Sequence, residues 1–226
     1  MTAKQISAQT SLEKNILVRL MRAVTPRGPF RETGEEEYAH TPYSEAYLTP
    51  DISGCFPVMV AIVDIGGSHG NALRQIKEDT PGLKGRLILQ DLEPVILEHD
   101  KALRADRFEP MVYDFFKQVQ PVRGALIYYF RRIFHDWPDV PESKQILENT
   151  AASMDRHSRI LIHDIIVPEV GATMSHAWQD ISLLAIGGIE RTEKNFARLL
   201  DSAGLELVKV WSKSGDMLGI VEARLK

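Results

Sequence analysis

The stretch Ala61-Ile62-Val63-Asp64-Ile65-Gly66-Gly67-Ser68-His69-Gly70 decides the fold expected of this chain. Asp64 comes near the end of a short apolar run, a glycine-rich turn follows, and residues 71–76 open with helical periodicity. This order is typical of a β-strand that leads into a tight loop at a helix N-terminus, where backbone N–H groups can face a nucleotide-like ligand. An ordinary structural turn is the competing interpretation. The glycine spacing differs from Gly-x-Gly-x-x-Gly, which argues against a dinucleotide-dependent dehydrogenase.

A second acid supports a ligand at this loop. Asp91 directly follows the apolar run 86–90, which is predicted to be the next strand. In α/β nucleotide sites, an acid about 20 residues beyond the glycine-rich loop binds the ribose hydroxyls. The alternative is that Asp91 only caps the helix expected to begin at residue 92.

The third predicted strand also ends in residues suited to a nucleotide. Asp114 and Phe115 follow the run 110–113. Because ligands gather outside the carboxyl ends of strands in an open α/β sheet, Asp114 could accept from an exocyclic amine and Phe115 could cover a purine face. A loop acid followed by core phenylalanines is the alternative.

Three further groups are candidates for chemistry. His135 lies just past the fourth predicted strand, where an imidazole can serve as a general base near neutral pH. Asp164 follows another strand, Glu190 precedes a helix, and either carboxylate could orient that imidazole. As alternatives, His135 is held by Asp136 in a helix cap, and the two acids are caps or surface groups. The other histidines form no ligand-like cluster and the chain has one cysteine, so no metal site is predicted.

Apolar runs alternate with helical periods from residue 61 onward, which predicts an α/β fold with a doubly wound, mostly parallel sheet. The runs 205–211 and 217–223 are joined by the polar turn 212–216, which is short enough only for an antiparallel hairpin. One antiparallel C-terminal strand is therefore expected. The expected elements are 61–65, 71–79, 86–90, 94–104, 110–113, 124–129, 141–154, 158–166, 193–203, 205–211 and 217–223.

The first part of the chain has a different pattern. Residues 11–24 repeat apolar side chains at helical spacing, residues 27–37 are polar, and residues 38–48 have a short strand-like pattern. This pattern fits a small helix-plus-hairpin module that is not a self-sufficient domain.

Composition restricts the class of protein. The 226 residues are 44% hydrophobic and carry a net charge of −4, with no basic run that indicates nucleic acid or an anionic membrane as a partner. Cys55 is the single cysteine, so an intrachain disulfide is impossible and an intracellular location is favoured. No leader or long apolar span is apparent, and a cytoplasmic protein is expected.

Taken together, these motifs resemble one family, the S-adenosylmethionine-dependent O-methyltransferases of the plant caffeate type in their fungal secondary-metabolism form. The resemblance covers residues 61–226 and rests on their order. The matching segments are Val63-Asp64-Ile65-Gly66-Gly67-Ser68-His69-Gly70, Leu89-Gln90-Asp91-Leu92, Tyr113-Asp114-Phe115-Phe116, Tyr128-Tyr129-Phe130-Arg131-Arg132-Ile133-Phe134-His135-Asp136-Trp137-Pro138-Asp139 and Gly187-Gly188-Ile189-Glu190-Arg191-Thr192-Glu193.

The resemblance implies a Rossmann-like methyltransferase sheet and a role for each matched residue. The loop 64–70 would hold the methionine end of S-adenosyl-L-methionine, and Asp91 its ribose. Asp114 and Phe115 would lie at the adenine, with Arg131 close by. His135 would be the general base that deprotonates an acceptor hydroxyl, flanked by Asp164 and Glu190. The residues implied to bind the cofactor are Asp64, Gly66, Gly67, Ser68, Gly70, Asp91, Leu92, Asp114, Phe115 and Arg131.

Residues 1–57 are expected to be a partial winged-helix, dimerisation-like module, and residues 58–226 the S-adenosylmethionine-binding domain. Residues 38–44 and 52–56 resemble the end of the family's winged-helix module. The sequence departs from the family pattern in two ways. Ser68 stands where many relatives have glycine, and only a few residues at 56–61 replace a long helical segment that forms part of the acceptor pocket. The family is homodimeric, but the shortened module argues against a dimer here.

The function expected is methyl transfer to a hydroxyl of a small aromatic or polyketide-like secondary metabolite, with His135 as the base. One alternative is an inactive or regulatory cofactor-binding paralogue, which the missing segment favours. Another is a methyltransferase-like enzyme that performs non-methylating natural-product chemistry.

Overall fold

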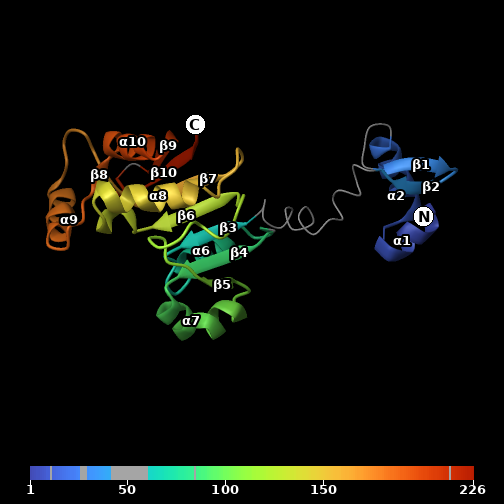
Figure 1. Cartoon of the computed structure of the whole chain (residues 1–226), viewed down its shortest axis with the longest axis horizontal. Coiled ribbons are helices and arrows are strands. Elements are labelled where there is room, and N and C mark those ends of the chain that lie inside the picture. The colour runs from blue at the N-terminus through green and yellow to red at the C-terminus, as the bar shows by residue number, and fades with distance from the viewer. Residues whose placement is uncertain (11, 26–29, 42–60, 84, 214) are drawn as a thin grey trace. The chain divides into compact units, whose positions relative to one another are not determined.

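The computed structural model describes residues 1–10, 12–25, 30–41, 61–83, 85–213 and 215–226. The chain divides into two compact units, Met1–Phe56 and Pro57–Lys226 (Figure 1). The predicted domain boundary at 57/58 lies outside the described residues, as do the motif 52–56 and the join at 56–60. Within the described ranges, no helix is both long and apolar enough to cross a membrane.

The Met1–Phe56 unit contains two helices and a hairpin among its described residues. The elements are α1 (Ala3–Thr10), α2 (Lys14–Val24), β1 (Phe30–Gly34) and β2 (Glu37–His40). Leu17, Val18 and Met21 from one face of α2 pack with Tyr38 of β2. This buried face accounts for the helical spacing of apolar residues in the sequence. The polar stretch 27–37 proves to hold strand β1, which pairs antiparallel with β2. The winged-helix assignment stays a prediction, and residues 42–48 lie outside the described part.

The Pro57–Lys226 unit is built on one sheet, whose strand order is β5-β4-β3-β6-β7-β10-β9 in the described residues (Figure 1). Neighbours from β5 to β7 are parallel, whereas β10 is antiparallel to both β7 and β9. The mostly parallel sheet with one antiparallel C-terminal strand is thus confirmed. The strands are β3 (Ile62–Ile65), β4 (Leu87–Asp91), β5 (Glu109–Val112), β6 (Ile127–Arg131), β7 (Arg159–Val167), β9 (Leu205–Ser212) and β10 (Leu218–Leu225), and β8 (Arg191–Thr192) pairs with β7.

Helices cover both faces of this sheet because successive strand residues point to opposite sides. In β3, Ile62 belongs to a core cluster with Leu73 and Leu103, whereas Val63 belongs to the other cluster with Phe196. The covering helices are α6 (Asn71–Asp79) and α7 (Glu93–Ala105) on the first side, and α8 (Lys144–Ala151) and α10 (Glu193–Ser202) on the second. This alternation produces the doubly wound fold.

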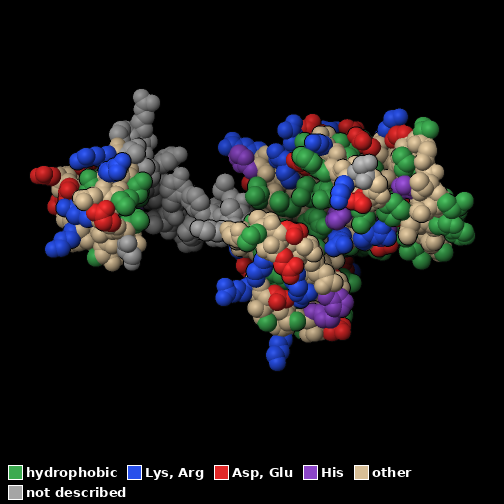
Figure 2. Space-filling view, turned by 180° about the vertical axis from the view of Figure 1, so that it is seen from behind, with side chains coloured by type: hydrophobic (Ala, Val, Ile, Leu, Met, Phe, Trp, Pro, Cys, Tyr) green, Lys and Arg blue, Asp and Glu red, His purple; other side chains and the backbone are tan. Residues whose placement is uncertain are grey.

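Helix α9 (Met174–Leu184) was not expected from the sequence. Its large apolar side chains are mostly exposed, including Met174 at 72% and Trp178 at 63%. Figure 2 shows hydrophobic side chains at the end of the unit where α9 lies, and another group over its middle. A helix with apolar side chains facing solvent gives a weak amphipathic pattern, which is why periodicity missed it.

Candidate active site

The glycine-rich loop after β3 folds tightly against the neighbouring strand. The backbone N–H groups of Gly66 and Gly67 both donate to the carbonyl of Gln90, at 2.8 and 3.2 Å. Gly66 has φ +74°, and a Cβ there would lie 2.5 Å from Ile133 Cδ1. A Cβ on Gly67 would lie 2.6 Å from Asp64 Oδ2. The loop therefore favours glycine at position 66 for conformation and space, and at position 67 for space.

Ser68 and Asp91 tie this loop to the tip of β4. Ser68 has φ +50°, an unfavourable conformation for a residue with a side chain. Its backbone N–H donates to Asp91 Oδ2 at 2.9 Å, and Leu92 N–H donates to Asp91 Oδ1 at 2.8 Å. The N-cap of α7 is Leu92, so Asp91 is not the cap. Each oxygen of Asp91 keeps a further lone pair that could accept from a ligand hydroxyl.

A cavity of about 360 Å³ opens beside the loop at the carboxyl ends of β4, β5 and β6. Its size lies within the usual range for ligand sites. The lining residues are Gly66, Asp91, Leu92, Tyr113, Asp114, Phe115, Phe116, Ile133, Asp136 and Trp137. Five residues that the sequence assigned to the cofactor thus meet at one cavity, as expected for parallel strands that end at the same edge.

Sequence reasoning did not assign the other half of that lining. Phe116 and Trp137 meet edge to face, with ring centroids 4.7 Å apart, and Asp136 lies beside them. The motif that contains them predicts a base at His135 and, as the alternative, a cap contact for Asp136, but no role for Trp137. The adjacency of these residues in the sequence was the signal that could have found them.

Asp114 forms a hydrogen bond and an ion pair within its own loop. Its carboxylate accepts from Phe116 N–H at 3.1 Å and pairs with Lys117 at 2.9 Å. The hydrogen bond from Lys117 lowers the pKa of Asp114, so the group is a carboxylate at neutral pH.

Asp64 lies beneath the glycine-rich loop and does not line the cavity. Only 1% of Asp64 is exposed, and its Oδ2 has no hydrogen-bond partner. Burial raises its pKa to about 7; the positive charge of Arg131 opposes this rise and the negative charge of Asp91 adds to it. Arg131 itself lines a different hollow, together with Tyr129 and His163. Arg131 therefore acts on the charge of Asp64 and is not among the residues that line the predicted adenine cavity.

His135 lies in a 3₁₀ turn, Phe134–Asp136, that follows β6. Its Nδ1 is 3.3 Å from Glu190 Oε1, and its Nε2 is 3.4 Å from Asp136 Oδ1. Burial alone would lower the pKa of His135, but the hydrogen bond to Glu190 and the negative charge of Asp164 outweigh it. The pKa is consequently raised above its usual 6.5.

The two acids predicted to flank His135 are both buried. Asp164, on β7, has no exposed surface and neither of its carboxylate oxygens has a hydrogen-bond partner. Burial raises the pKa of Asp164 to about 6, opposed by the charge of His135 and increased by that of Glu190. Arg132, which sequence reasoning passed over, lies 3.8 Å from Glu190. The structure thus brings the imidazole and both acids into one buried cluster next to the cavity.

The described residues were also compared with the arrangements that bind metal ions. Among the residues that the structure describes, no group of three or more His, Cys, Asp or Glu side chains is arranged to hold an ion.

The chain is similar to several proteins of known class. O-methyltransferase kntB of Aspergillus niger is 30% identical over 312 aligned residues, which cover 99% of this chain and 75% of that protein. O-methyltransferase GME11366 of Pestalotiopsis microspora is 40% identical over 176 residues, which cover 77% of this chain and 43% of that protein. Both relatives are fungal O-methyltransferases, as the resemblance implied.

A solved structure agrees with this match. The crystal structure of OxaC superposes with a TM-score of 0.72 at 53% identity, and the match covers 100% of this chain and 79% of OxaC. OxaC has also been crystallised with sinefungin and meleagrin, and with SAH and oxaline. A sequence model of the O-methyltransferase domain matches residues 51–206, more than half of the chain. The protein therefore belongs to the S-adenosylmethionine-dependent O-methyltransferases of fungal secondary metabolism.

Proposed function

We propose that this protein methylates a hydroxyl group of a small aromatic or polyketide-like metabolite, with His135 as the general base. The observation that carries the proposal is the buried His135, which contacts Glu190 and is influenced by the negative charge of Asp164, beside a cavity of about 360 Å³. Such an arrangement suits proton removal better than metal-assisted or nucleophilic chemistry, because the described cluster contains a base and its orienting acids.

The residues around the cavity fit S-adenosyl-L-methionine. When bound, this cofactor supplies an electrophilic methyl group on a positively charged sulfur. Gly66 lines the cavity without a side chain, and Asp91 has lone pairs for ribose hydroxyls. When ionised, the buried carboxyl of Asp64, with its unpaired Oδ2, would place negative potential beneath the loop that would carry the cationic end.

The proton would leave the acceptor through His135 Nε2. Nδ1–H can donate to Glu190, which leaves Nε2 as the basic nitrogen. The negative charges of Glu190 and Asp164 stabilise the imidazolium that forms. Deprotonation would make the acceptor oxygen a better nucleophile toward the methyl group that the bound cofactor supplies.

The aromatic part of the lining suits the flat adenine of the cofactor, because Asp91, Asp114 and Phe115 line the same cavity. Phe116 and Trp137 present ring surface at the cavity, next to Asp136. The complexes of OxaC with meleagrin and oxaline support a small-molecule acceptor for a protein of this type.

The proposal can be tested with His135→Ala and His135→Gln in single-turnover assays with methyl-labelled cofactor. Loss of a general base is expected to reduce the rate by about 100-fold or more. Sinefungin affinity, measured by isothermal titration, should change little because His135 does not line the cavity. Unchanged turnover in both variants would remove His135 from the mechanism.

A regulatory paralogue and a non-methylating enzyme remain the alternatives. The alignment with kntB runs over 312 residues for a chain of 226, so kntB has residues that this chain lacks. If these residues complete the acceptor site, the chain would bind sinefungin without transferring a methyl group to any hydroxylated aromatic acceptor. An acceptor converted without methylation, detected by mass spectrometry, would favour the non-methylating enzyme.

A further inference from the structure

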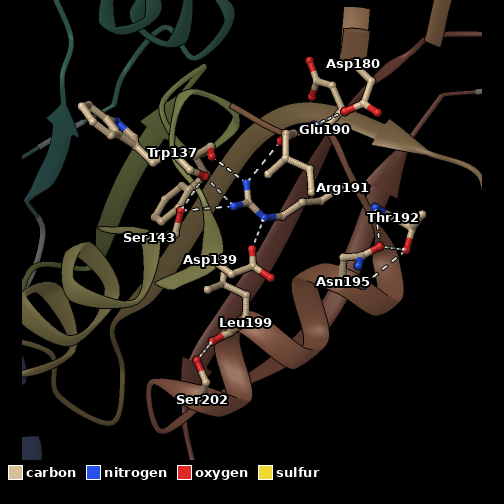
Figure 3. A network of polar contacts seen from close by, with 12 residues as sticks. Trp137, Asp139, Ser143, Asp180, Glu190, Arg191, Thr192, Asn195, Leu199 and Ser202 are labelled. Carbon is tan, nitrogen blue, oxygen red and sulfur yellow. Dashed lines mark hydrogen bonds and ion pairs between the residues drawn. The ribbon is translucent and has the colours of Figure 1, made fainter. Parts of the chain in front are cut away.

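Arg191 is a buried cation at which several segments of the active-site region meet (Figure 3). Only 1% of its surface is exposed. Its Nη1 donates to the Phe134 carbonyl at 2.6 Å, and its Nη2 donates to the Trp137 carbonyl at 2.7 Å and to Ser143 Oγ at 3.2 Å. Nε donates to Asp139 Oδ1 at 2.8 Å. The guanidinium thus joins the loop after β6 to strand β8.

These contacts lie on both sides of His135. Phe134 is the residue before it, and Trp137 is two residues after it. Glu190, which contacts the imidazole, is the immediate neighbour of Arg191 in the sequence. Of two consecutive residues, Glu190 therefore contacts the ring of His135, and Arg191 contacts the backbone on either side of it, at Phe134 and Trp137.

Arg191 is itself attached to the central sheet through β8. Arg191 pairs with Ile166 in the parallel ladder between β8 and β7, and β7 also carries Asp164. The carbonyl of His135 accepts from Ile189 N–H at 2.8 Å, which adds a further link between the same two segments. A Cβ on Gly188 would lie 2.4 Å from that carbonyl, so the two backbones approach as closely as glycine permits.

We propose that Arg191 is a positioning residue for methyl transfer, which fixes the loop 134–139 so that the His135 imidazole stays in contact with Glu190. This inference rests on the proposed role of His135 as the base. A lysine could not replace the guanidinium, because a single ammonium group cannot reach two carbonyls, a carboxylate and a hydroxyl in one fixed geometry. A purely stabilising arginine would not need to contact the backbone on both sides of the base.

The charges around His135 fix the direction of the expected change. Glu190, Asp164 and Asp136 face the imidazole with negative charge, and Arg132 faces it with positive charge. When the imidazole stays buried, release of the loop removes only the contact with Glu190, and this hydrogen bond raises the pKa of His135 in the intact protein. The pKa of His135 should therefore fall when Arg191 is replaced.

The test compares Arg191→Lys and Arg191→Met with the control Arg86→Lys. Arg86 also forms a partly buried bidentate pair, with Glu109, but lies at the start of β4, at the opposite end of the strand from Asp91. For both Arg191 variants, we expect kcat to fall about 10- to 100-fold in protein that remains folded by circular dichroism. The acidic limb of the kcat–pH profile should move to lower pH, while Arg86→Lys keeps the wild-type profile.

Two outcomes would overturn the inference. One is a lower melting temperature with an unchanged kcat and pH profile, which would make Arg191 a structural residue only. The other is full recovery of kcat by Arg191→Lys, which would mean that charge alone suffices.

Nuclear magnetic resonance separates this inference from the proposed function. The pKa and tautomer of ¹⁵N-labelled His135 report its contact with Glu190 whether or not His135 acts as the base. If His135→Gln keeps full turnover but Arg191→Met lowers the pKa of His135, the positioning role of Arg191 is supported and the assignment of His135 as the base fails. If the His135 resonances of Arg191→Met titrate with the wild-type pKa, this result alone refutes the positioning role of Arg191.

Discussion

Replacement of Asp64 by Asn should stabilise the cofactor-free protein, increasingly so as the pH rises. Asp64 is 1% exposed, its Oδ2 has no partner, and burial raises its pKa from 3.8 to about 7. An acid whose pKa is raised by folding destabilises the folded state once it must ionise. The destabilisation begins as the pH rises above 3.8 and is complete above about 7.

The magnitude follows from that pKa change. At about 1.4 kcal/mol per pH unit, a rise from 3.8 to about 7 corresponds to about 4 kcal/mol at full ionisation. At pH 5 less than half of this cost is present, so the advantage of Asp64→Asn should grow by about 2.5 kcal/mol between pH 5 and pH 8. Any constant effect of the amide on packing cancels in this difference.

The measurement is urea unfolding of the full chain at both pH values, followed by tryptophan fluorescence. All three tryptophans lie in the Pro57–Lys226 unit, so the signal reports on the unit that contains Asp64. Asp216→Asn, an exposed acid in the turn between β9 and β10, is the control and should show the same small effect at both pH values. An Asp64→Asn effect that is equal at pH 5 and pH 8 would refute the reasoning.

Three further predictions follow from the same geometry. Gly66→Ala places a Cβ 2.5 Å from Ile133 Cδ1 at a φ of +74°, so sinefungin binding should weaken at least about 10-fold by calorimetry; wild-type affinity would contradict the tight fit of this loop. Gln120→Ala leaves the buried Gln90 amide without both of its 2.8 Å partners, which should cost about 2 kcal/mol of unfolding free energy in urea at pH 7; a loss below about 0.5 kcal/mol would count against the pair. Because the pKa of His135 is raised above 6.5 and its neutral form is the proposed base, kcat should fall as the pH drops through that raised pKa; a profile that is flat from pH 5 to pH 8 would speak against it.

The sequence predicted the order of elements well where periodicity was strong. Helix α6 occupies the predicted range 71–79, and β3 falls within 61–65, because each has a buried apolar face and clear flanking residues. Strand β6 begins at Ile127, later than predicted, because Ala125 N–H donates to the hydroxyl of Tyr128 and is held in a turn. That contact depends on a folded loop and leaves no periodic signal.

The candidate site was likewise predictable only in part from the sequence. Because Asp91, Asp114 and His135 follow successive parallel strands, their place at one edge of the sheet could be deduced from the sequence and its family resemblance. The strand order that inserts β10 between β7 and β9 could not, since pairing partners are chosen by packing over long sequence distances.

What the sequence by itself determined is the fold class; the cofactor loop, the acids and the base are predictions from the sequence and its family resemblance. Only the tertiary structure decided which charges are buried and what holds them. Arg191 is a cation in a polar motif by sequence, yet in the fold it lies buried against the carbonyls of Phe134 and Trp137, more than fifty positions away. Burial and hydrogen-bond partners are set by segments distant along the chain, and local sequence patterns carry no record of those contacts.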